Sequence, residues 1–380
     1  MRRWPRWAQR ITLLCGSTVL SFVFLEIVLR IVVGFDSTVA GSDAENRPRD
    51  NEWVFYEYDP LLGWKNKACA EGFFSISDSR THVKINSKGL RGDEHSYEKN
   101  GKRRILVLGD SFTWGFGVEQ ADRYTEQVEA MMGPGVEIIN AGVSGYGTDQ
   151  ELLWFTQEGM KYHPDIVLLE FGLEDIINNN HALQYSYPKP LYVVKDGQLE
   201  LTNTPVPRRD ARWEERVRSP ATTEPQIAES GWKRNKEGAK NFIKGHFVAP
   251  TLIVRGFRNL RDRLFPPVRQ QDLDLLTRML LLELRHRVTA TGAQFVVVMV
   301  PYRWYFHHHD PSWDAWKAFF KSNDFLCDDL EWAFTHARVN PEKLYFRIDT
   351  HWDSMGHKMA ARAIWEFFSQ NGLSKPEKGN

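Results

Sequence analysis

The stretch RRILVLGDSFTWGFG, residues 103–117, decides the fold and raises the question of function. Its apolar run, residues 105–108, is typical of a strand buried in a parallel sheet. The run stops at Gly109-Asp110-Ser111, and aromatic residues and glycines follow it. A serine in that position is either a small polar turn residue or a side chain placed there for chemistry, and the rest of the chain has to decide between the two.

Further apolar runs of the same kind alternate with segments long enough to be helices. They are Val136–Ile139, Ile166–Phe171, Phe295–Val300 and Leu344–Ile348. This alternation indicates an α/β fold, and we predict a three-layer α/β/α sandwich with a parallel sheet of about five strands. Residues 272–292 have the pattern of an amphipathic helix closed by a glycine, and residues 191–202 predict a hairpin with Asp196-Gly197 as its turn.

Unusual polar segments follow four of these runs. Ser111 follows the first run, Gly145 in NAGVSGYG the second, GLEDIINNN (172–180) the third and DTHWDSMGH (349–357) the last. Sites in parallel sheets lie beyond the carboxyl ends of the strands, so we expect these segments to meet at one edge of the sheet.

Ester chemistry would explain this set of residues. A serine hydroxyl is a poor nucleophile until a base removes its proton, and the base needs a carboxylate that fixes its tautomer and orientation. Asp349 and His351 are two residues apart and can turn toward the same pocket. Backbone N–H groups of Ser111 and Gly145 could stabilise the oxyanion that forms during acyl transfer.

The same segments resemble the sequence blocks of the SGNH (GDSL-type) hydrolases. GDSFTWG resembles their first block, NAGVSG the second and DTHWDSMGHKMAA the last. The resemblance implies that Ser111 is the nucleophile, that Gly145 is an oxyanion donor, and that Asp349 and His351 complete the triad. The Asp-x-His spacing is similar to that of alginate O-acetylation proteins, a membrane-anchored, polysaccharide-modifying branch of this superfamily.

The third block departs from the family pattern. It usually reads Gly-x-Asn-Asp, with the asparagine amide as an oxyanion donor, whereas Glu174 stands at the asparagine position here. Loss of one such donor costs about 3 to 4 kcal/mol of transition-state stabilisation. Four explanations stay open: burial keeps Glu174 protonated, its side chain points away, Asn178 replaces the amide one helical turn later, or the site no longer turns over.

The N-terminal residues predict a membrane anchor. Residues 11–35 are largely apolar and would form a helix of roughly 37 Å, which is long enough to cross a bilayer. The four arginines in residues 1–10 predict a cytoplasmic basic tail. Glu26 and Arg30 can pair on one face of the anchor helix.

This prediction sets the organisation of the whole chain. Residues 36–50 read as a linker and residues 51–375 as an SGNH-hydrolase-like domain on the extracytoplasmic side, periplasmic or extracellular. TVAG at 38–41 is a weak cleavage site, so removal of the anchor stays open. An insertion is predicted at about residues 178–265.

The insertion is rich in proline and in basic side chains over residues 206–270. A solvated charged surface is the simplest explanation, while contact with an acidic polymer or an anionic lipid surface is the sharper one. Residues 251–265, TLIVRGFRNLRDRLF, would suit a helix lying on a membrane. The formal net charge of zero argues against nucleic acid as a partner.

The remaining candidates are cysteines, histidines and aromatic residues. In an oxidising compartment Cys69 and Cys327 could form a disulfide, and two lone thiols are the alternative. His307–His309 are adjacent, and adjacent histidines rarely converge on one ion, so no metal site is expected. Aromatic side chains after the fourth run could form a stacking wall for sugar rings, or pack in the core; they are Trp304, Tyr305, Trp313 and Trp316.

These observations predict a serine esterase that needs no cofactor and acts on O-acetyl or similar acyl groups of an extracytoplasmic glycan. Two alternatives remain. The first is a polysaccharide O-acyltransferase that uses the same triad and receives acyl groups from a membrane acyl-donor partner. The second is a catalytically inactive protein that binds or assembles a glycan. Since fold and anchor do not fix a substrate, the preference for an acylated or acidic polysaccharide rests on the resemblance alone.

Overall fold

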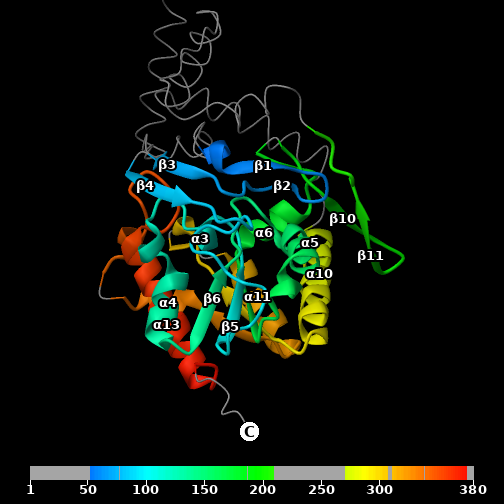
Figure 1. Ribbon diagram of the computed structural model, residues 1–380. Coiled ribbons are helices and arrows are strands. Elements are labelled where there is room, and N and C mark those ends of the chain that lie inside the picture. Colours follow the sequence, from blue (N-terminus) through cyan, green and yellow to red (C-terminus); the bar gives the residue numbers. More distant parts are fainter. Residues whose placement is uncertain are drawn as a thin grey trace, which may run out of the picture. The chain divides into compact units, whose positions relative to one another are not determined.

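The computed structural model describes residues 52–208 and 270–374, except residues 77, 186, 307–309 and 338 (Figure 1). The predicted anchor, the linker and most of the predicted insertion therefore lie outside the described residues, as does the basic segment 251–265. No helix in the described ranges is both long enough and apolar enough to cross a bilayer.

A parallel sheet of five strands organises the described residues. In spatial order its strands are β13 (Leu326–Asp329), β12 (Gln294–Met299), β7 (Ile166–Phe171), β5 (Arg103–Leu108) and β6 (Val136–Asn140). This confirms the prediction of a parallel sheet of about five strands. Strands β5, β6, β7 and β12 are mostly apolar because helices cover both faces of the sheet.

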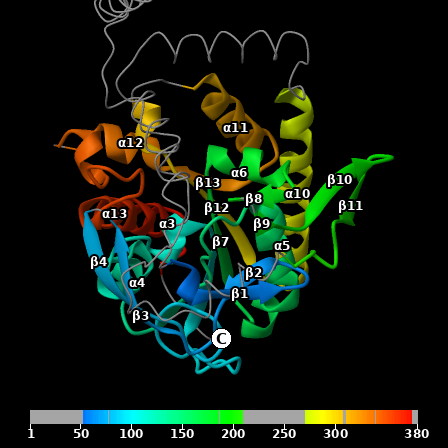
Figure 2. The ribbon, with the colours of Figure 1, turned by 90° about the horizontal axis from the view of Figure 1, so that it is seen from above.

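Alternate side chains of the strands enter two separate hydrophobic cores. In β5, Leu106 and Leu108 join one core, whereas Ile105 and Val107 join the other. The first core is covered by α5 (Thr148–Gln157), α6 (Leu173–Asn179), α10 (Gln270–Ala290) and α11 (Pro311–Ser322). The second core is covered by α4 (Tyr124–Met132), α12 (Leu330–Thr335) and α13 (Ser354–Gln370). The three layers of the predicted sandwich are visible in Figures 1 and 2.

Short antiparallel hairpins complete the fold. They are β1 (Tyr56–Asp59) with β2 (Gly63–Asn66), β3 (Glu71–Ile76) with β4 (Ser79–Lys84), β8 (Leu183–Gln184) with β9 (Tyr187–Pro188), and β10 (Leu191–Lys195) with β11 (Gln198–Thr202). The hairpins β1–β2 and β3–β4 lie over the end of the sheet where α3 (Ser111–Trp114) and α6 begin (Figure 1). Trp64 Nε1, for example, donates to the carbonyl of Ser144 at 3.1 Å.

Single-turn 3₁₀ helices connect several of these elements. They are η2 (Glu52–Phe55), η3 (Gln120–Asp122), η4 (Gly159–Tyr162), η5 (Arg303–Phe306) and η6 (Pro341–Leu344).

Two local predictions are confirmed. The hairpin β10–β11 turns at Asp196 and Gly197, which both have positive φ, as a two-residue turn of this kind requires. Helix α10 spans the predicted amphipathic segment, and Gly292, with φ of 86°, follows its end.

The predicted fifth strand is wrong. Residues 344–348 end the 3₁₀ helix η6 and continue as a loop, and the fifth strand is instead β13, whose sequence is LCDD. Leu344 and Tyr345 are buried, but they pack in the core beneath α13 instead of in the sheet. Strand β13 pairs only with β12, and such an edge strand does not need an apolar sequence.

Candidate active site

The turn after β5 presents Ser111 at the carboxyl edge of the sheet. Asp110 Oδ1 accepts a hydrogen bond from Phe112 N at 2.8 Å and so caps the single turn of α3. Gly109 leaves no room for a side chain, because a Cβ there would lie 2.6 Å from Glu170 Oε2. Chains leave β5 and β7 toward opposite faces of the sheet, so Ser111 lies at a topological switch point.

The structure brings Ser111, His351 and Asp349 together. Ser111 Oγ lies 2.6 Å from His351 Nε2, and His351 Nδ1 lies 2.5 Å from Asp349 Oδ1. Asp349 Oδ1 also accepts from the backbone N–H of His351 at 3.0 Å. Because Nδ1–H of His351 donates its hydrogen bond to the carboxylate, Nε2 carries no proton in the neutral ring. Nε2 can therefore accept the hydrogen bond of the serine hydroxyl. The three residues have the connectivity of a nucleophile, its base and the group that orients the base.

The surroundings of His351 favour its charged form. Burial alone would lower the pKa of His351, but the carboxylates of Asp349, Asp110 and Glu174 together raise it above its ordinary value. The ring of Phe116 stacks on the imidazole, with 4.1 Å between ring centroids and 22° between planes. An imidazolium formed at this position is therefore surrounded by acidic groups and an aromatic face.

Two backbone donors are available beside Ser111. The loop after β6 is fixed to the end of β5, where Val143 N donates to Gly109 O at 3.1 Å. In this loop Gly145 has φ of 78°, and a Cβ would lie 2.6 Å from the ring of Tyr185. Within the described parts of the chain, the N–H groups of Ser111 and Gly145 donate to no other residue. They are the two N–H groups predicted to stabilise an oxyanion.

Glu174 is desolvated and lies close enough to the site to interact with it. Burial, together with the nearby charge of Asp110, raises its pKa to about 7, while His351 acts in the opposite direction. Glu174 therefore keeps its proton to a much higher pH than an exposed glutamate does. Asn178, the other residue considered as an amide donor, lies one helical turn further along α6. Its side chain lies beside Gly147, because a Cβ placed on Gly147 would be 3.1 Å from Asn178 Cβ.

A group of buried carboxyl groups lies beneath these residues. Glu170 Oε2 accepts from Asp110 N at 3.1 Å and from Thr113 Oγ1 at 3.2 Å. Asp175 Oδ2 accepts from Gly172 N at 2.9 Å. Neither carboxyl oxygen of Glu151 has a hydrogen-bond partner among the residues that the structure describes. Burial raises the pKa of Glu151, Glu170 and Asp175 well above ordinary values, and their mutual repulsion adds to the effect.

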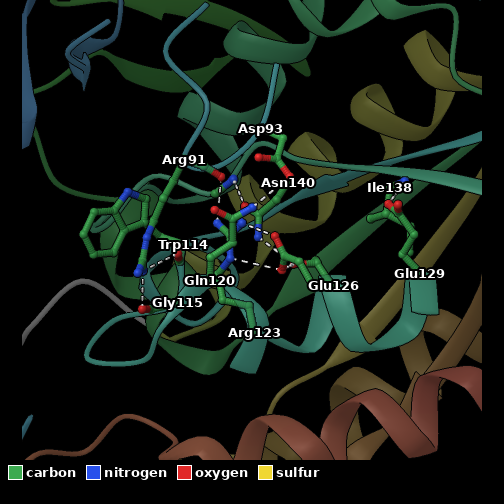
Figure 3. Close-up of polar contacts among 12 residues, drawn as sticks. Arg91, Asp93, Trp114, Gly115, Gln120, Arg123, Glu126, Glu129, Ile138 and Asn140 are labelled. Atoms are coloured by element: carbon green, nitrogen blue, oxygen red, sulfur yellow. Dashed lines mark hydrogen bonds and ion pairs between the residues drawn. The ribbon is translucent and has the colours of Figure 1, made fainter. Parts of the chain in front are cut away.

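Two buried arginines, Arg91 and Arg123, hold the chain where α3 ends, at Trp114 and Gly115 (Figure 3). Arg91 donates to the carbonyls of Trp114 and Gly115, and Arg123 Nη1 donates to the carbonyl of Arg91 at 2.8 Å. Asn140, at the end of β6, donates to Thr113 O at 2.6 Å and thereby joins α3 to the Gly145 loop. The nucleophile turn is thus fixed from both ends.

Of the two roles considered for the aromatic residues after the fourth apolar run, packing in the core is confirmed for three of the four, and the stacking wall is contradicted for them. Tyr305, Trp313 and Trp316 are buried in the core, where the rings of Tyr305 and Trp313 lie 4.9 Å apart. They cannot stack on a sugar ring because other side chains already cover their faces. Trp304 alone is exposed, and its ring stacks on Tyr302 at 6.5 Å.

Of the two alternatives for Cys69 and Cys327, the structure agrees with lone thiols and contradicts the disulfide. Both cysteines are free thiols: Cys69 is exposed in the turn between β2 and β3, and Cys327 lies in the edge strand β13. The two positions belong to separate parts of the fold, and a disulfide needs Cα atoms within about 7 Å of each other.

Metal binding is not supported within the ranges 52–208 and 270–374 as described, since no group of three or more His, Cys, Asp or Glu side chains there could hold an ion. His307–His309 lie outside the described residues.

Several residues of the site escaped the sequence reasoning. Phe116, Tyr185 and Asn140 are ordinary in type and carry no reactive group, so only their contacts reveal them. Asn140 begins the NAGVSG segment and could have been noticed there. Glu170 could have been noticed as a charged residue inside an apolar strand.

Two family models match the sequence. Residues 107–221 match the GDSL-like lipase/acylhydrolase family. Residues 267–379 match the SGNH hydrolase-like domain of the acetyltransferase AlgX. Ser111 falls in the first match, and Asp349 and His351 fall in the second. A comparison with curated proteins gave no match.

Solved structures of low sequence identity resemble the chain. A member of the lipolytic protein G-D-S-L family from Veillonella parvula is 12% identical with a TM-score of 0.39, covering 70% of this chain and 98% of its own. A variant of Axe2, an acetyl xylan esterase from Geobacillus stearothermophilus, is 14% identical with a TM-score of 0.39, covering 72% of this chain and 96% of its own. The family assignment rests on the two sequence matches.

Proposed function

Because the chain belongs to the SGNH (GDSL-type) hydrolase superfamily of ester-acting enzymes, we propose that Ser111, His351 and Asp349 form a catalytic triad. The observation that carries this proposal is the 2.6 Å contact between Ser111 Oγ and His351 Nε2. The reaction is cleavage of an acyl ester, with transfer of the acyl group first to Ser111.

The mechanism follows from the geometry of the three side chains. His351 Nε2 removes the hydroxyl proton as Ser111 Oγ attacks the ester carbonyl, and Asp349 stabilises the resulting imidazolium. The tetrahedral oxyanion lies against the N–H groups of Ser111 and Gly145. The imidazolium then gives its proton to the leaving alkoxide, and an acyl-Ser111 ester remains. Water or another hydroxyl, deprotonated by His351, attacks this ester. The acyl–Oγ bond then breaks, the imidazolium returns the proton to Ser111 Oγ, and the acyl group leaves as a carboxylic acid or a new ester.

Glu174 acts in its protonated form. A neutral carboxylic acid can donate one hydrogen bond, whereas an ionised carboxylate would repel the oxyanion. The raised pKa of about 7 supports a proton on this side chain at and below neutral pH. Glu174 then takes the place of the asparagine amide of related proteins.

The acyl group is acetyl and the substrate is an O-acetylated or acidic glycan outside the cytoplasm. Support for this part comes from the AlgX-like match over residues 267–379 and from the anchor pattern in residues 1–35. In cells whose outer membrane, where present, has been removed, an external protease should then degrade the catalytic domain and spare residues 1–10. Complete protection of the domain under these conditions, with an intact cytoplasmic membrane, would contradict this location.

A second function, O-acyl transfer, is favoured by the same AlgX-like match. It uses the same acyl-Ser111 intermediate, and a glycan hydroxyl replaces water in the second step. The acyl group would come from a membrane acyl-donor partner. A product that forms only when a glycan acceptor is present would distinguish transfer from hydrolysis.

The first experiment compares the wild-type chain with Ser111→Ala. A serine-directed fluorophosphonate should label the wild type, and the label should disappear in the variant together with p-nitrophenyl acetate turnover. Triad serines contribute a rate factor of about 10⁶. Absence of labelling in the wild type would favour an inactive glycan-binding protein over an enzyme.

A further inference from the structure

Phe116 lies in a turn whose shape depends on two glycines. Helix α3 ends at Gly115, and Gly115 and Gly117 both have positive φ, 86° and 78°. The chain reverses between them and directs the Phe116 ring against His351, 4.1 Å away between centroids. Side chains fit at neither glycine: a Cβ on Gly117 would lie 2.7 Å from Ile76 Cδ1, and one on Gly115 would lie 2.5 Å from Arg123 Cγ.

Arg91 holds this turn through three carbonyl groups. Its Nη1 donates to Trp114 O at 3.0 Å and to Gly115 O at 2.5 Å, and its Nη2 donates to Val118 O at 2.7 Å. The guanidinium also lies 4.6 Å from the centroid of the Trp114 ring (Figure 3). The three acceptors bracket Phe116 on both sides along the chain, so one buried side chain fixes the position of the stacked ring.

Arg91 is held in turn by Arg123. Arg123 Nη1 donates to the Arg91 carbonyl, and the Arg123 guanidinium forms an ion pair with Glu126 at the start of α4. Arg91 itself has no carboxylate partner among the residues described, although burial of a cation is costly. Burial and the neighbouring Arg123 lower the pKa of Arg91 to about 9.

We propose that Phe116 is a positioning residue for His351, stabilising its imidazolium form, and that Arg91 fixes Phe116 in that position. The proposal rests on the proposed function. A cation over an aromatic face is stabilised, and the imidazolium is the charged species that arises when His351 takes the Ser111 proton. The usual strength of such contacts corresponds to roughly a 2- to 30-fold effect on rate.

Other groups around His351 must be separated from this effect. The carboxylates that face it are Asp349 in its own loop, Asp110 in the nucleophile turn and Glu174 on α6, and all three favour its protonated form. Phe112 also contacts the ring, at 5.0 Å and 41°. A Phe116→Leu substitution leaves all four in place and removes only the stacked ring.

The test compares Phe116→Leu, Phe116→Tyr and a matched control in the full chain. The control is Phe295→Leu. Phe295 is as buried as Phe116, 7% against 8% exposed, and packs on Phe325. It lies at the amino end of β12, whereas Ser111 lies at the carboxyl edge of the sheet. In Phe116→Leu, kcat for p-nitrophenyl acetate should fall roughly 2- to 30-fold with KM unchanged. The acid limb of kcat/KM should move to lower pH, because a histidine without the stacked ring holds its proton less tightly.

The remaining variants sharpen the conclusion. Phe116→Tyr keeps an aromatic face against His351, so its pH dependence of kcat/KM should match that of the wild type. Arg91→Lys cannot reach all three carbonyls and should reproduce the pH shift of Phe116→Leu, and the double variant should show no larger shift than Phe116→Leu alone. A wild-type pH profile in Phe116→Leu, or an equal change in Phe295→Leu, would overturn the proposal.

A second readout does not depend on turnover. The His351 imidazole can be titrated by NMR in histidine-labelled protein, with its signal identified by its loss in His351→Gln. Its pKa should be lower in Phe116→Leu than in the wild type, and an unchanged value refutes the stacking role. Failure of the triad itself would show differently, as fluorophosphonate labelling that persists in Ser111→Ala or is absent from the wild type.

Discussion

Glu174 stands where the SGNH sequence block usually has an asparagine, and this difference changes the chemistry proposed for the site. An acid with a pKa of about 7 changes charge within the range in which esterases are assayed. Below that value it is a neutral hydrogen-bond donor, and above it is an anion beside the developing oxyanion. The proposed reaction therefore requires a neutral His351 and a protonated Glu174 at the same time.

A pH profile tests this requirement. In the wild type, kcat/KM for p-nitrophenyl acetate should fall above about pH 7, by about tenfold per pH unit for a single essential proton. Glu174→Gln keeps an N–H donor at every pH, so its profile should stay level above pH 7. Glu366→Gln on the exposed face of α13 serves as the matched control and should retain the fall. Persistence of the fall in Glu174→Gln would assign it to a different group.

At this scale the sequence identifies the residues of the proposed triad better than the residues that position them. Ser111, Asp349 and His351 could be named because each follows an apolar run and has a recognisable chemistry. Phe116 and Tyr185 could not, because a phenylalanine or tyrosine side chain has the same appearance in a core as beside a catalytic histidine. Their position depends on glycine turns and arginine contacts that are formed only in the folded chain.

At the scale of elements, a buried ion pair ties the segment after α6 to the start of α5. Lys189 Nζ lies 2.5 Å from Asp149 Oδ2 and donates to Asn178 O at 2.8 Å, and neither side chain of the pair is exposed. The segment held in this way, residues 182–189, carries the Tyr185 ring that covers Gly145. Burial raises the pKa of Asp149, and the Lys189 cation partly offsets that effect.

Removing one member of this pair should be costly. Lys189→Met leaves Asp149 buried without its partner, and we expect a loss of about 3 to 5 kcal/mol in the free energy of unfolding, measured by chemical denaturation. Lys195→Met breaks the exposed pair with Glu200 in the β10–β11 hairpin and should cost less than about 1 kcal/mol. The double variant Lys189→Met/Asp149→Leu should recover much of the loss, and equal losses in the two single lysine variants would contradict this account.

Elements with a strong local pattern were predictable, and the others were not. Strands β5, β6, β7 and β12 consist mainly of apolar residues, which is typical of a parallel sheet covered on both faces. The β10–β11 hairpin carries Asp-Gly at its turn, a pair typical of two-residue turns. Strand β13 has no such pattern because it is an edge strand with two aspartates. Among the residues expected as the fifth strand, Leu344 and Tyr345 are apolar for a different reason, since they fill the core under α13.

At the scale of the whole molecule, buried acids make stability depend on pH in an unusual direction. Glu151 has an ordinary pKa near 4.5 in the unfolded chain and a value well above that in the folded protein. The folded state therefore binds more protons, and stability must decrease as the pH rises from the unfolded toward the folded pKa. Glu170 and Asp175 act in the same direction.

Glu151→Gln should remove part of this dependence. The amide has no charge to bury, so at pH 8 the variant should be more stable than the wild type, by about 1.4 kcal/mol for each unit by which folding raises the pKa. At pH 4 the two proteins should differ little, because both carry a neutral side chain in the folded state. Thermal unfolding from pH 4 to 9 measures this difference. The exposed substitution Glu98→Gln should follow the wild-type curve, and a parallel curve for Glu151→Gln would refute the assignment.

The contact between Ser111 and His351 joins residues 240 positions apart in the chain. At translation rates of about 5 to 20 residues per second, the histidine leaves the ribosome roughly 12 to 48 s after the serine. On the proposed mechanism, the nascent chain carries the nucleophile without its base during that interval, and strands β12 and β13 are made within it. A product that stops before residue 351 would lack the proposed base and should not be labelled by the fluorophosphonate.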